Sequence, residues 1–250
     1  MLRTVSATRY VTPLREGGSL PALVEASDDG LYVTKLRGAG QGPKALVAEV
    51  ICGELARALG LPVPELALVD LPVELSHAEP DPEIQELLQA SAGLNLGLDF
   101  LPGALPYTPV GRVQPTPEQA ADIVWFDTWT ENVDRTPRNP NLVVWHGAPW
   151  LIDHGAALYR QHQPDGLGGG GGRFPLSAQH VLLPVAASIA DADGRLRPRV
   201  DRALLERVVG LVPTDWLGDV PASLYVEDLL ARLDGDRPWV AGAEEARTGA

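Results

Sequence analysis

The sequence predicts an α+β fold with two lobes, a β-rich N-lobe with one main helix and a mostly helical C-lobe. Short β-forming runs separated by turn signals occupy residues 1–100, whereas residues 101–250 carry several helix-start signals. The boundary falls where Leu101-Pro102-Gly103 ends the last β-like run. With 26 glycines and 23 prolines among 250 residues, the chain is too rich in turns for a helical bundle or a coiled coil.

The N-lobe contains several predicted strands and two predicted helices. The strands are residues 4–14, 22–26, 31–36, 65–71 and 94–100. Apolar residues recur at helical spacing over residues 44–59, and Gly60 supplies a C-terminal stop for this main helix. A short helix begins after Asp81, which is an N-cap residue followed by Pro82 at the first helical position.

The C-lobe begins with a helix whose start is clearly marked. Residues 116–119 read Thr-Pro-Glu-Gln, a capping box with proline at the first helical position, and the helix ends near Glu131. Residues 132–141 contain two prolines and several polar side chains, which excludes a regular helix and predicts a rigid loop. Two further helices are predicted over residues 200–211 and 223–233.

A hairpin, residues 142–155, is predicted to follow this loop. Two β-like runs flank a four-residue turn, and pairing Trp145 with Trp150 across it would set Asp153 opposite Leu142. We therefore expect the hairpin to carry Asp153 back to the loop that precedes it.

Charge and composition exclude several classes of protein. The formal net charge of −13 argues against general nucleic-acid binding, which needs a basic surface. A single cysteine, Cys52, excludes a disulfide scaffold and a cysteine-based zinc module. No apolar run approaches the ~20 residues that span a bilayer, and no long apolar run follows Arg3, so we expect no signal peptide. We expect a cytoplasmic protein that binds neither nucleic acid nor a membrane directly.

The rarity of lysine marks one strand residue. Of 20 basic residues only Lys35 and Lys44 are lysines, so arginine provides the general positive charge of this chain. Along the predicted strand 31–36, side chains alternate between two faces, which puts Lys35 on the face of Leu31 and Val33. A charged residue on the apolar side of a strand often marks a functional site.

Polar residues of the rigid loop and the hairpin form a second candidate site. Asp134 precedes Asn139 by five residues, and the hairpin then brings in Asp153. Phosphoryl transfer uses this arrangement, in which one aspartate orients the attacking hydroxyl while the asparagine and the later aspartate hold metal ions. Such oxygen ligands suit Mg²⁺ rather than zinc. Asn141 is the alternative to Asn139 as a metal ligand.

In the same arrangement, Lys35 would contact the α- and β-phosphates, and a glutamate of the main helix would hold the lysine. Glu49 flanks the apolar stripe of that helix and is the favoured partner, with Glu54 as the alternative. The lysine, its glutamate and the loop residues thus predict one phosphate-binding site.

Together these motifs resemble a known family. They are Tyr32-Val33-Thr34-Lys35, the helix from Glu49 to Leu-Pro-Val-Pro-Glu at 61–65, Asn132-Val133-Asp134-Arg135 with Asn139, and Leu151-Ile152-Asp153-His154-Gly155. Over about residues 15–160 the chain resembles the HipA-like kinases, which share the protein-kinase-like fold. The resemblance implies use of ATP and Mg²⁺ and serine or threonine phosphorylation of a protein substrate. By position it implies a catalytic aspartate at Asp134, metal ligands at Asn139 and Asp153, a phosphate-binding lysine at Lys35 and its partner at Glu49.

A kinase would bind ATP between the two lobes. We expect the adenine near Asp99-Phe100-Leu101 and a phosphate contact at the turn Gly17-Gly18-Ser19. The glycine-rich link 38–42 with Lys44 is the alternative phosphate cradle.

The chain also departs from the kinase pattern. Asp134-Arg135-Thr136 replaces the usual Asp-Arg-His, and Asp153-His154-Gly155 replaces Asp-Phe-Gly. No Gly-x-Gly-x-x-Gly precedes Lys35. Two alternatives to a protein kinase therefore stay open: a catalytically inactive nucleotide-binding module, and a kinase that acts on a small molecule.

Overall fold

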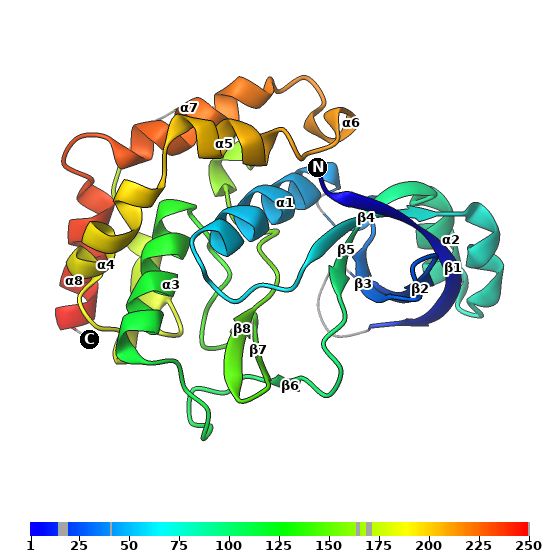
Figure 1. Ribbon diagram of the computed structural model, residues 1–250, viewed down its shortest axis with the longest axis horizontal. Helices are drawn as coiled ribbons and strands as arrows, with labels where there is room; N and C mark the ends of the chain where they lie inside the picture. Colours follow the sequence, from blue (N-terminus) through cyan, green and yellow to red (C-terminus); the bar gives the residue numbers. More distant parts are fainter. Residues whose placement is uncertain (15–19, 41, 164–165, 169–171, 250) are drawn as a thin grey trace.

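The computed structural model describes residues 1–14, 20–40, 42–163, 166–168 and 172–249. It has a strand-rich end and a helix-rich end, with a long helix running between them (Figure 1). The turn Gly17-Gly18-Ser19, predicted to contact phosphate, lies outside the described residues.

The strand-rich end is a closed barrel. Its strands are β1 (Arg3–Pro13), β2 (Ala22–Ala26), β3 (Leu31–Lys35), β4 (Leu66–Leu71) and β5 (Gly93–Asp99). They follow the order β1-β2-β3-β5-β4, and a parallel pairing of β1 with β4 closes the barrel. All the predicted strands of this part are confirmed, with ends that differ by a few residues.

β1 closes the barrel because it is long and irregular. Its first residues pair with β4, and its later residues pair with β2. The register with β2 shifts between Ala7 and Arg9 and again between Tyr10 and Thr12. Such bulges bend a strand and increase its twist, which lets one strand serve two neighbours. The sequence did not predict this closure, because β1 and β4 are far apart along the chain.

β3 separates the interior of the barrel from a cavity outside it. Tyr32 and Thr34 are buried, and Tyr32 belongs to the apolar cluster of the barrel. Leu31, Val33 and Lys35 alternate with them on the opposite face, where Val33 and Lys35 line the cavity. The expected face of Lys35 is confirmed.

The predicted main helix is α1 (Pro43–Ala58), which connects the barrel to the helices. Gly60 follows its end with a φ of 84°, the left-handed conformation of a helix stop. α1 contacts α5 (Arg202–Val209) and α6 (Thr214–Leu217), and it belongs to the larger apolar cluster of the molecule. Its almost completely buried apolar side chains include Leu46, Val50, Ile51 and Leu55.

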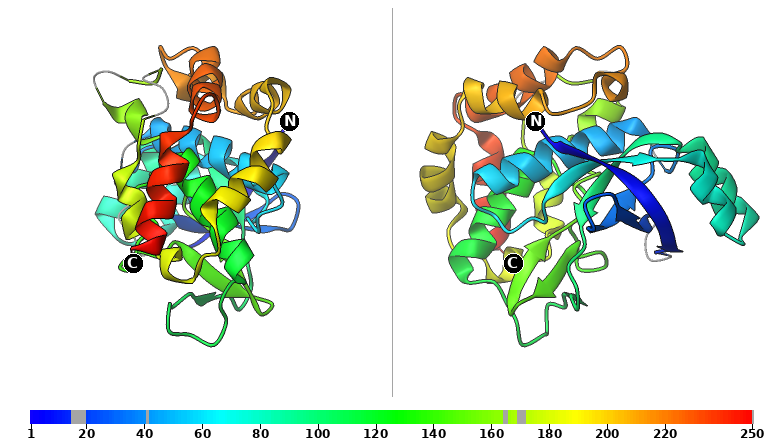
Figure 2. Two further views of the ribbon diagram at one scale, coloured as in Figure 1. Left: turned by 90° about the vertical axis from the view of Figure 1, so that its left-hand side faces the viewer. Right: turned by 45° about the vertical axis from the view of Figure 1, so that its right-hand side comes forward.

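The short helix predicted after Asp81 is also present, as α2 (Pro82–Ala90). The Asp81 carboxylate accepts a hydrogen bond from the backbone N–H of Glu83 at 3.1 Å. Together with the 3-10 helix η1 (Val73–Ala78), α2 lies at the end of the barrel that is remote from the other helices (Figure 2).

The helix-rich end is built around α3 (Pro117–Trp129), and its predicted capping box is confirmed. Thr116 Oγ1 accepts from the N–H of Gln119 at 3.2 Å, and Gln119 Oε1 accepts from the N–H of Thr116 at 3.0 Å. α5 and α7 (Ala222–Leu233) confirm the two further helices that were predicted. Among the described residues, no helix combines the length and the apolar character needed to cross a bilayer.

Three α-helices in the described part of the chain were not predicted. They are α4 (Ile189–Leu196), α6 and α8 (Pro238–Thr248). α6 is a single turn, while α4 and α8 each contain an internal glycine, which lowers intrinsic helix stability. Packing against the rest of the molecule stabilises them instead, because α4 and α8 both contact α3.

The hairpin is present, but its predicted register is wrong. β7 (Leu142–Trp145) and β8 (Ala148–Leu151) pair Trp145 with Ala148, so Leu142 lies opposite Leu151 rather than Asp153. His146 and Gly147 have φ values of 48° and 76°, and two left-handed residues close a hairpin in a two-residue turn. β6 (Leu105–Pro106) adds a third strand to this small sheet.

Three tryptophans form the centre of the helix-rich end. The ring centroid of Trp125 lies 5.5 Å from those of Trp129 and Trp239, and none of the three has exposed surface. Trp239 also donates from its indole N–H to the carbonyl of Arg232 at 2.7 Å. The packing and the hydrogen bond of Trp239 therefore hold α8 against the core.

Replacing Trp239 with alanine should lower the free energy of unfolding by about 3–5 kcal/mol, because it removes a buried aromatic side chain and leaves a cavity. The measurement is urea unfolding followed by circular dichroism. The control is Val110→Ala, since Val110 is 94% exposed, and its effect should stay within about 0.5 kcal/mol. Equal effects of the two substitutions would contradict the packing role of α8.

Candidate active site

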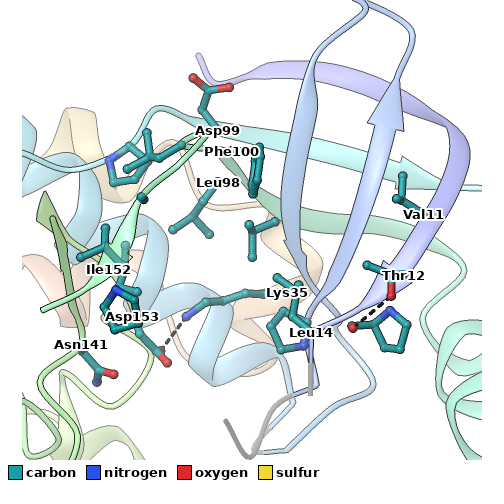
Figure 3. Close-up of a pocket in the computed structure, with 18 of the residues that line it drawn as sticks. Val11, Thr12, Leu14, Lys35, Leu98, Asp99, Phe100, Asn141, Ile152 and Asp153 are labelled. Carbon is teal, nitrogen blue, oxygen red and sulfur yellow. Dashed lines mark hydrogen bonds and ion pairs between the residues drawn. The ribbon is translucent and has the colours of Figure 1, made fainter. Parts of the chain in front are cut away.

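Lys35 joins three parts of the chain at one point. Its Nζ donates to Glu49 Oε2 on α1 at 2.8 Å and to Asp153 Oδ1 after β8 at 2.6 Å. Figure 3 shows Lys35 reaching across the cavity to Asp153. The Lys35 side chain is 12% exposed and that of Glu49 is 1% exposed, whereas that of Asp153 is 41% exposed. Glu49 therefore holds the Lys35 ammonium from the buried side, and Asp153 contacts it on the side that is open to the cavity.

The charges of this group stabilise one another. Burial alone would lower the pKa of Lys35, but the carboxylates of Glu49 and Asp153 outweigh it and raise that pKa above its usual value. Burial alone would raise the pKa of Glu49, but Lys35 and His154 outweigh burial and hold that pKa at about 2. Lys35 is a cation and Glu49 an anion at neutral pH.

The structure distinguishes Glu49 from Glu54. Glu49 contacts Lys35, whereas Glu54 pairs with Arg57 of the same helix at 3.5 Å. Glu49 is completely buried, although the sequence pattern placed it only at the edge of the apolar stripe of α1.

Asp134 is bonded to both candidate metal-binding asparagines. Its Oδ2 accepts from Asn139 Nδ2 at 2.7 Å and from Asn141 Nδ2 at 3.3 Å. The backbone N–H of Ile152 donates to the carbonyl of Asn141 at 3.1 Å, which brings the residue before Asp153 to the same loop. The expected meeting of the loop with the hairpin thus occurs, although the hairpin register differs.

A cavity of about 1030 Å³ connects these groups with the predicted adenine position. Its polar lining includes Lys35, Asp153, Asn139 and Asn141. Asp99, Phe100 and Leu101 line it as well, together with the apolar side chains of Val33, Leu98 and Ile152. In Figure 3, Asp99 and Phe100 lie on one side of Leu98, and Lys35 and Asp153 lie on the other. Apart from Asp99, the end near Phe100 and Leu101 is mainly apolar, whereas the other end carries the charges of Lys35 and Asp153.

The side-chain oxygens of this group could bind a hard divalent cation. Asp153 supplies a partly exposed carboxylate, and Asn139 and Asn141 bond to Asp134 through their amide nitrogens, which leaves their amide oxygens as possible ligands. Carboxylate and amide oxygens suit Mg²⁺. In the part of the chain that the structure describes, no three His, Cys, Asp or Glu side chains cluster as a metal site. A cation here would need further ligands, such as phosphate oxygens.

Lys44 does not reach this cavity. Its Nζ donates to the carbonyl of Gln161 at 2.7 Å, and Gln161 Nε2 donates back to the carbonyl of Lys44 at 3.2 Å. These reciprocal bonds tie the start of α1 to the chain that follows Asp153. They do not support the alternative phosphate cradle at residues 38–42.

His154 is completely buried beside the site. Its ring packs edge-on against Phe126 with centroids 6.2 Å apart, and its Nδ1 lies 3.9 Å from Glu49 Oε1. His154 thus lies between Glu49 on α1 and Phe126 on α3.

Sequence reasoning missed a buried ion pair behind the site. The guanidinium of Arg135 bonds to Asp127 on α3, with Nε and Oδ2 2.5 Å apart. A possible signal was present in the sequence, because Asp127 is a charged residue between Phe126 and Trp129 on an otherwise apolar helix face.

Comparison with protein families agrees with this geometry. The model of the family described as HipA-like kinase matches residues 8–167, more than half of the chain. The chain belongs to the HipA-like kinase family.

Two solved structures that are similar to this member of the HipA-like kinase family are kinases. The Helicobacter pylori proinflammatory kinase CtkA is similar over 100% of this chain and 99% of its own, with a TM-score of 0.59 and 12% identity. The Golgi casein kinase with Mn/ADP bound is similar over 98% of this chain and 74% of its own, with a TM-score of 0.56 and 13% identity. At these identities the similarity shows a kinase-like fold. No curated protein sequence matches the chain.

Replacing Glu49 with glutamine should lower the free energy of unfolding at neutral pH by about 3 kcal/mol. This is the lower end of the loss expected when a buried ion pair is broken, because Lys35 still has Asp153 as a charged partner. Since the folded-state pKa of Glu49 lies below its usual value, its stabilisation is present above about pH 4.3 and disappears as the pH falls toward 2. The difference between wild type and Glu49→Gln should shrink over that range in urea unfolding.

Glu54→Gln on the same helix is the matched control. Glu54 belongs to a partly exposed pair, so its replacement should cost less than about 1 kcal/mol. A larger loss for Glu54→Gln than for Glu49→Gln would contradict the account of this ion pair.

Proposed function

We propose that this protein is an ATP- and Mg²⁺-dependent kinase that phosphorylates serine or threonine in a protein substrate. The observation that carries the proposal is the convergence of Lys35, Glu49 and Asp153 beside a loop in which Asp134 bonds to Asn139. The family supports a phosphotransferase, and the Golgi casein kinase with Mn/ADP bound supports nucleotide and divalent-metal use by this fold.

Each residue has a distinct proposed task. Lys35 binds the α- and β-phosphates, and Glu49 keeps the ammonium directed into the cavity. Asp153 and Asn139, with Asn141 as alternative, hold the metal ions, which when bound neutralise charge on the phosphates. Asp134 orients the acceptor hydroxyl and accepts its proton. Catalysis then consists mainly of positioning and charge stabilisation.

The nucleotide base belongs at the apolar end of the cavity. The N–H groups of Asp99 and Phe100 already donate to the carbonyls of Glu65 and Leu31, at 2.8 and 2.9 Å. A base near Asp99-Phe100-Leu101 would therefore bond to the remaining backbone groups of this segment and pack against Val33 and Leu98.

In this proposal, residues 1–100 and 101–250 are the N-lobe and C-lobe of a kinase. The barrel supplies Lys35, and the second part supplies the loop 132–141 and the hairpin 142–155. ATP would bind between the two parts.

Wild-type protein should turn over ATP with Mg²⁺, and Asp134→Asn should reduce kcat by about 10²–10⁴-fold, because the residue that accepts the hydroxyl proton is lost. Asp153→Asn should reduce activity comparably, because it removes the negative charge of a metal-binding carboxylate. The assay follows transfer of labelled phosphate to the protein itself and to general protein acceptors. Asp219→Asn, at an exposed residue, should leave activity unchanged.

A measurement of ATP binding and an assay with small-molecule acceptors, run beside this one, distinguish the alternatives. ATP binding without transfer to any acceptor would indicate a catalytically inactive nucleotide-binding module. Transfer only to a metabolite would indicate a small-molecule kinase. Equal activity of wild type, Asp134→Asn and Asp153→Asn would contradict the proposed site.

Lys35 and a metal ion compete for Asp153, because Lys35 occupies its Oδ1. Replacing Lys35 with methionine should therefore tighten Mn²⁺ binding to the nucleotide-free protein by about 5-fold or more, the low end of typical couplings between sites. Electron paramagnetic resonance of free Mn²⁺ measures the dissociation constant.

The other lysine provides the control. Lys44 donates to Gln161 and does not line the cavity, so Lys44→Met should bind Mn²⁺ as wild type does. Weaker or unchanged Mn²⁺ binding by Lys35→Met would exclude competition at Asp153.

A further inference from the structure

The buried carboxylate of Asp127 on α3 joins three segments around the candidate site. Its side chain is 1% exposed. It accepts from Arg135 Nε at 2.5 Å, from Asn132 Nδ2 at 3.0 Å and from His180 Nε2 at 2.9 Å. His180 Nδ1 accepts from the backbone N–H of Leu182 at 3.1 Å, so in the neutral ring the proton is on Nε2 and points to Asp127.

One path from Asp127 leads to Asp153. The guanidinium of Arg135 donates through Nη1 to the carbonyl of Asn141 and to that of Ile152, the latter at 3.3 Å. These carbonyls lie at the meeting of loop and hairpin, where Asn141 and Asp153 have φ values of 48° and 58°. Non-glycine residues hold such conformations when the surroundings fix them. Arg135 supplies that constraint at the residue next to Asp153.

A second path leads to Asp134. Asn132 donates to Asp127 through Nδ2 and accepts from the backbone N–H of Asp134 through Oδ1, at 3.2 Å. The two paths start at opposite oxygens of one carboxylate, since Asn132 bonds to Oδ1 and Arg135 to Oδ2. Asp127 therefore ties the backbone of Asp134 to the backbone beside Asp153.

We infer that Asp127 and Arg135 are positioning residues that fix the separation of Asp134 from the metal-binding groups around Asp153, without touching substrate or metal themselves. The inference rests on the proposed function, because it assigns a purpose to the relative placement of these groups. Mg²⁺ demands near-ideal octahedral geometry, and sites of this kind need their ligands held to about 0.5 Å. A buried charged pair with bonds to both segments meets that demand.

The Asp127 carboxylate keeps its negative charge at neutral pH. Burial would raise the pKa of Asp127, but Arg135 and His180 outweigh it and hold the pKa well below its usual value. Both oxygens of Asp127 thus remain acceptors for Asn132, Arg135 and His180.

The hydrogen bonds toward Asp153 and those toward Asp134 can be removed separately by substitution. Arg135→Lys keeps a positive charge for Asp127 but loses the planar fork that also reaches the carbonyls of Asn141 and Ile152. Asn132→Ala keeps the Asp127–Arg135 pair but loses the bond to the backbone of Asp134. The measurements are the Mn²⁺ dissociation constant in the presence of ADP, kcat with Mg²⁺ and ATP, and the melting temperature of each variant.

Arg135→Lys should weaken Mn²⁺ binding by about 10–100-fold, as loss of a residue that orients metal ligands does. Asn132→Ala should lower kcat by about 10-fold or more, because Asp134 is misplaced, while Mn²⁺ affinity stays within about 2-fold of wild type. If Arg135→Lys does not fold, the split shown by Asn132→Ala still decides the question. Arg237→Lys is the matched control, because Arg237 pairs with Asp193 at 3.0 Å and neither residue lines the cavity.

The control should lose melting temperature without changing kcat or Mn²⁺ affinity. The inference is overturned if Arg135→Lys and Asn132→Ala change kcat and Mn²⁺ affinity only in proportion to their loss of melting temperature, as a purely structural role requires. That result leaves the proposed function intact as long as the wild type binds Mn²⁺ and ADP and transfers phosphate. A wild type that binds neither would overturn the proposed function and this inference together.

Discussion

The ion pairs of Lys35 with Glu49 and Asp153 are the interactions on which the candidate site depends. They join the barrel, α1 and the chain after β8, three parts that otherwise meet around an open cavity. The desolvation cost of burying Lys35 and Glu49 is offset because each is the other's partner. One of the three charges, on Asp153, remains partly exposed, and it is the group that the proposal assigns to a metal ion.

Much of the fold could be predicted from local signals. The strands of the barrel, the capping box at Thr116 and the stop at Gly60 each have a short-range cause, and all are present. Features set by distant contacts could not be predicted: the pairing of β1 with β4, and the helices α4 and α8 that packing stabilises. The hairpin register was missed because His146 adopts a left-handed conformation that the sequence does not require.

The site was predictable to a similar degree. The rarity of lysine marked Lys35, and the spacing of Asp134, Asn139 and Asp153 marked the loop and hairpin. The choice of Glu49 over Glu54 depends on which side of α1 faces the barrel, which only the packed structure reveals. The contacts of Asp127 could not be predicted because its partners Arg135 and His180 come from separate segments, so the local sequence marks Asp127 as unusual without indicating its partners. Local conflicts between charge and burial are the sequence signal that would find such residues.

The most direct test of the central claim is a crystal structure with Mg²⁺ and a non-hydrolysable ATP analogue. The account predicts that Lys35 keeps its bond to Glu49 but exchanges Asp153 for phosphate oxygens, while Asp153 binds the metal ion. An analogue whose phosphates bind away from Lys35, or a Lys35 that stays paired with Asp153 while the metal binds elsewhere, would contradict it.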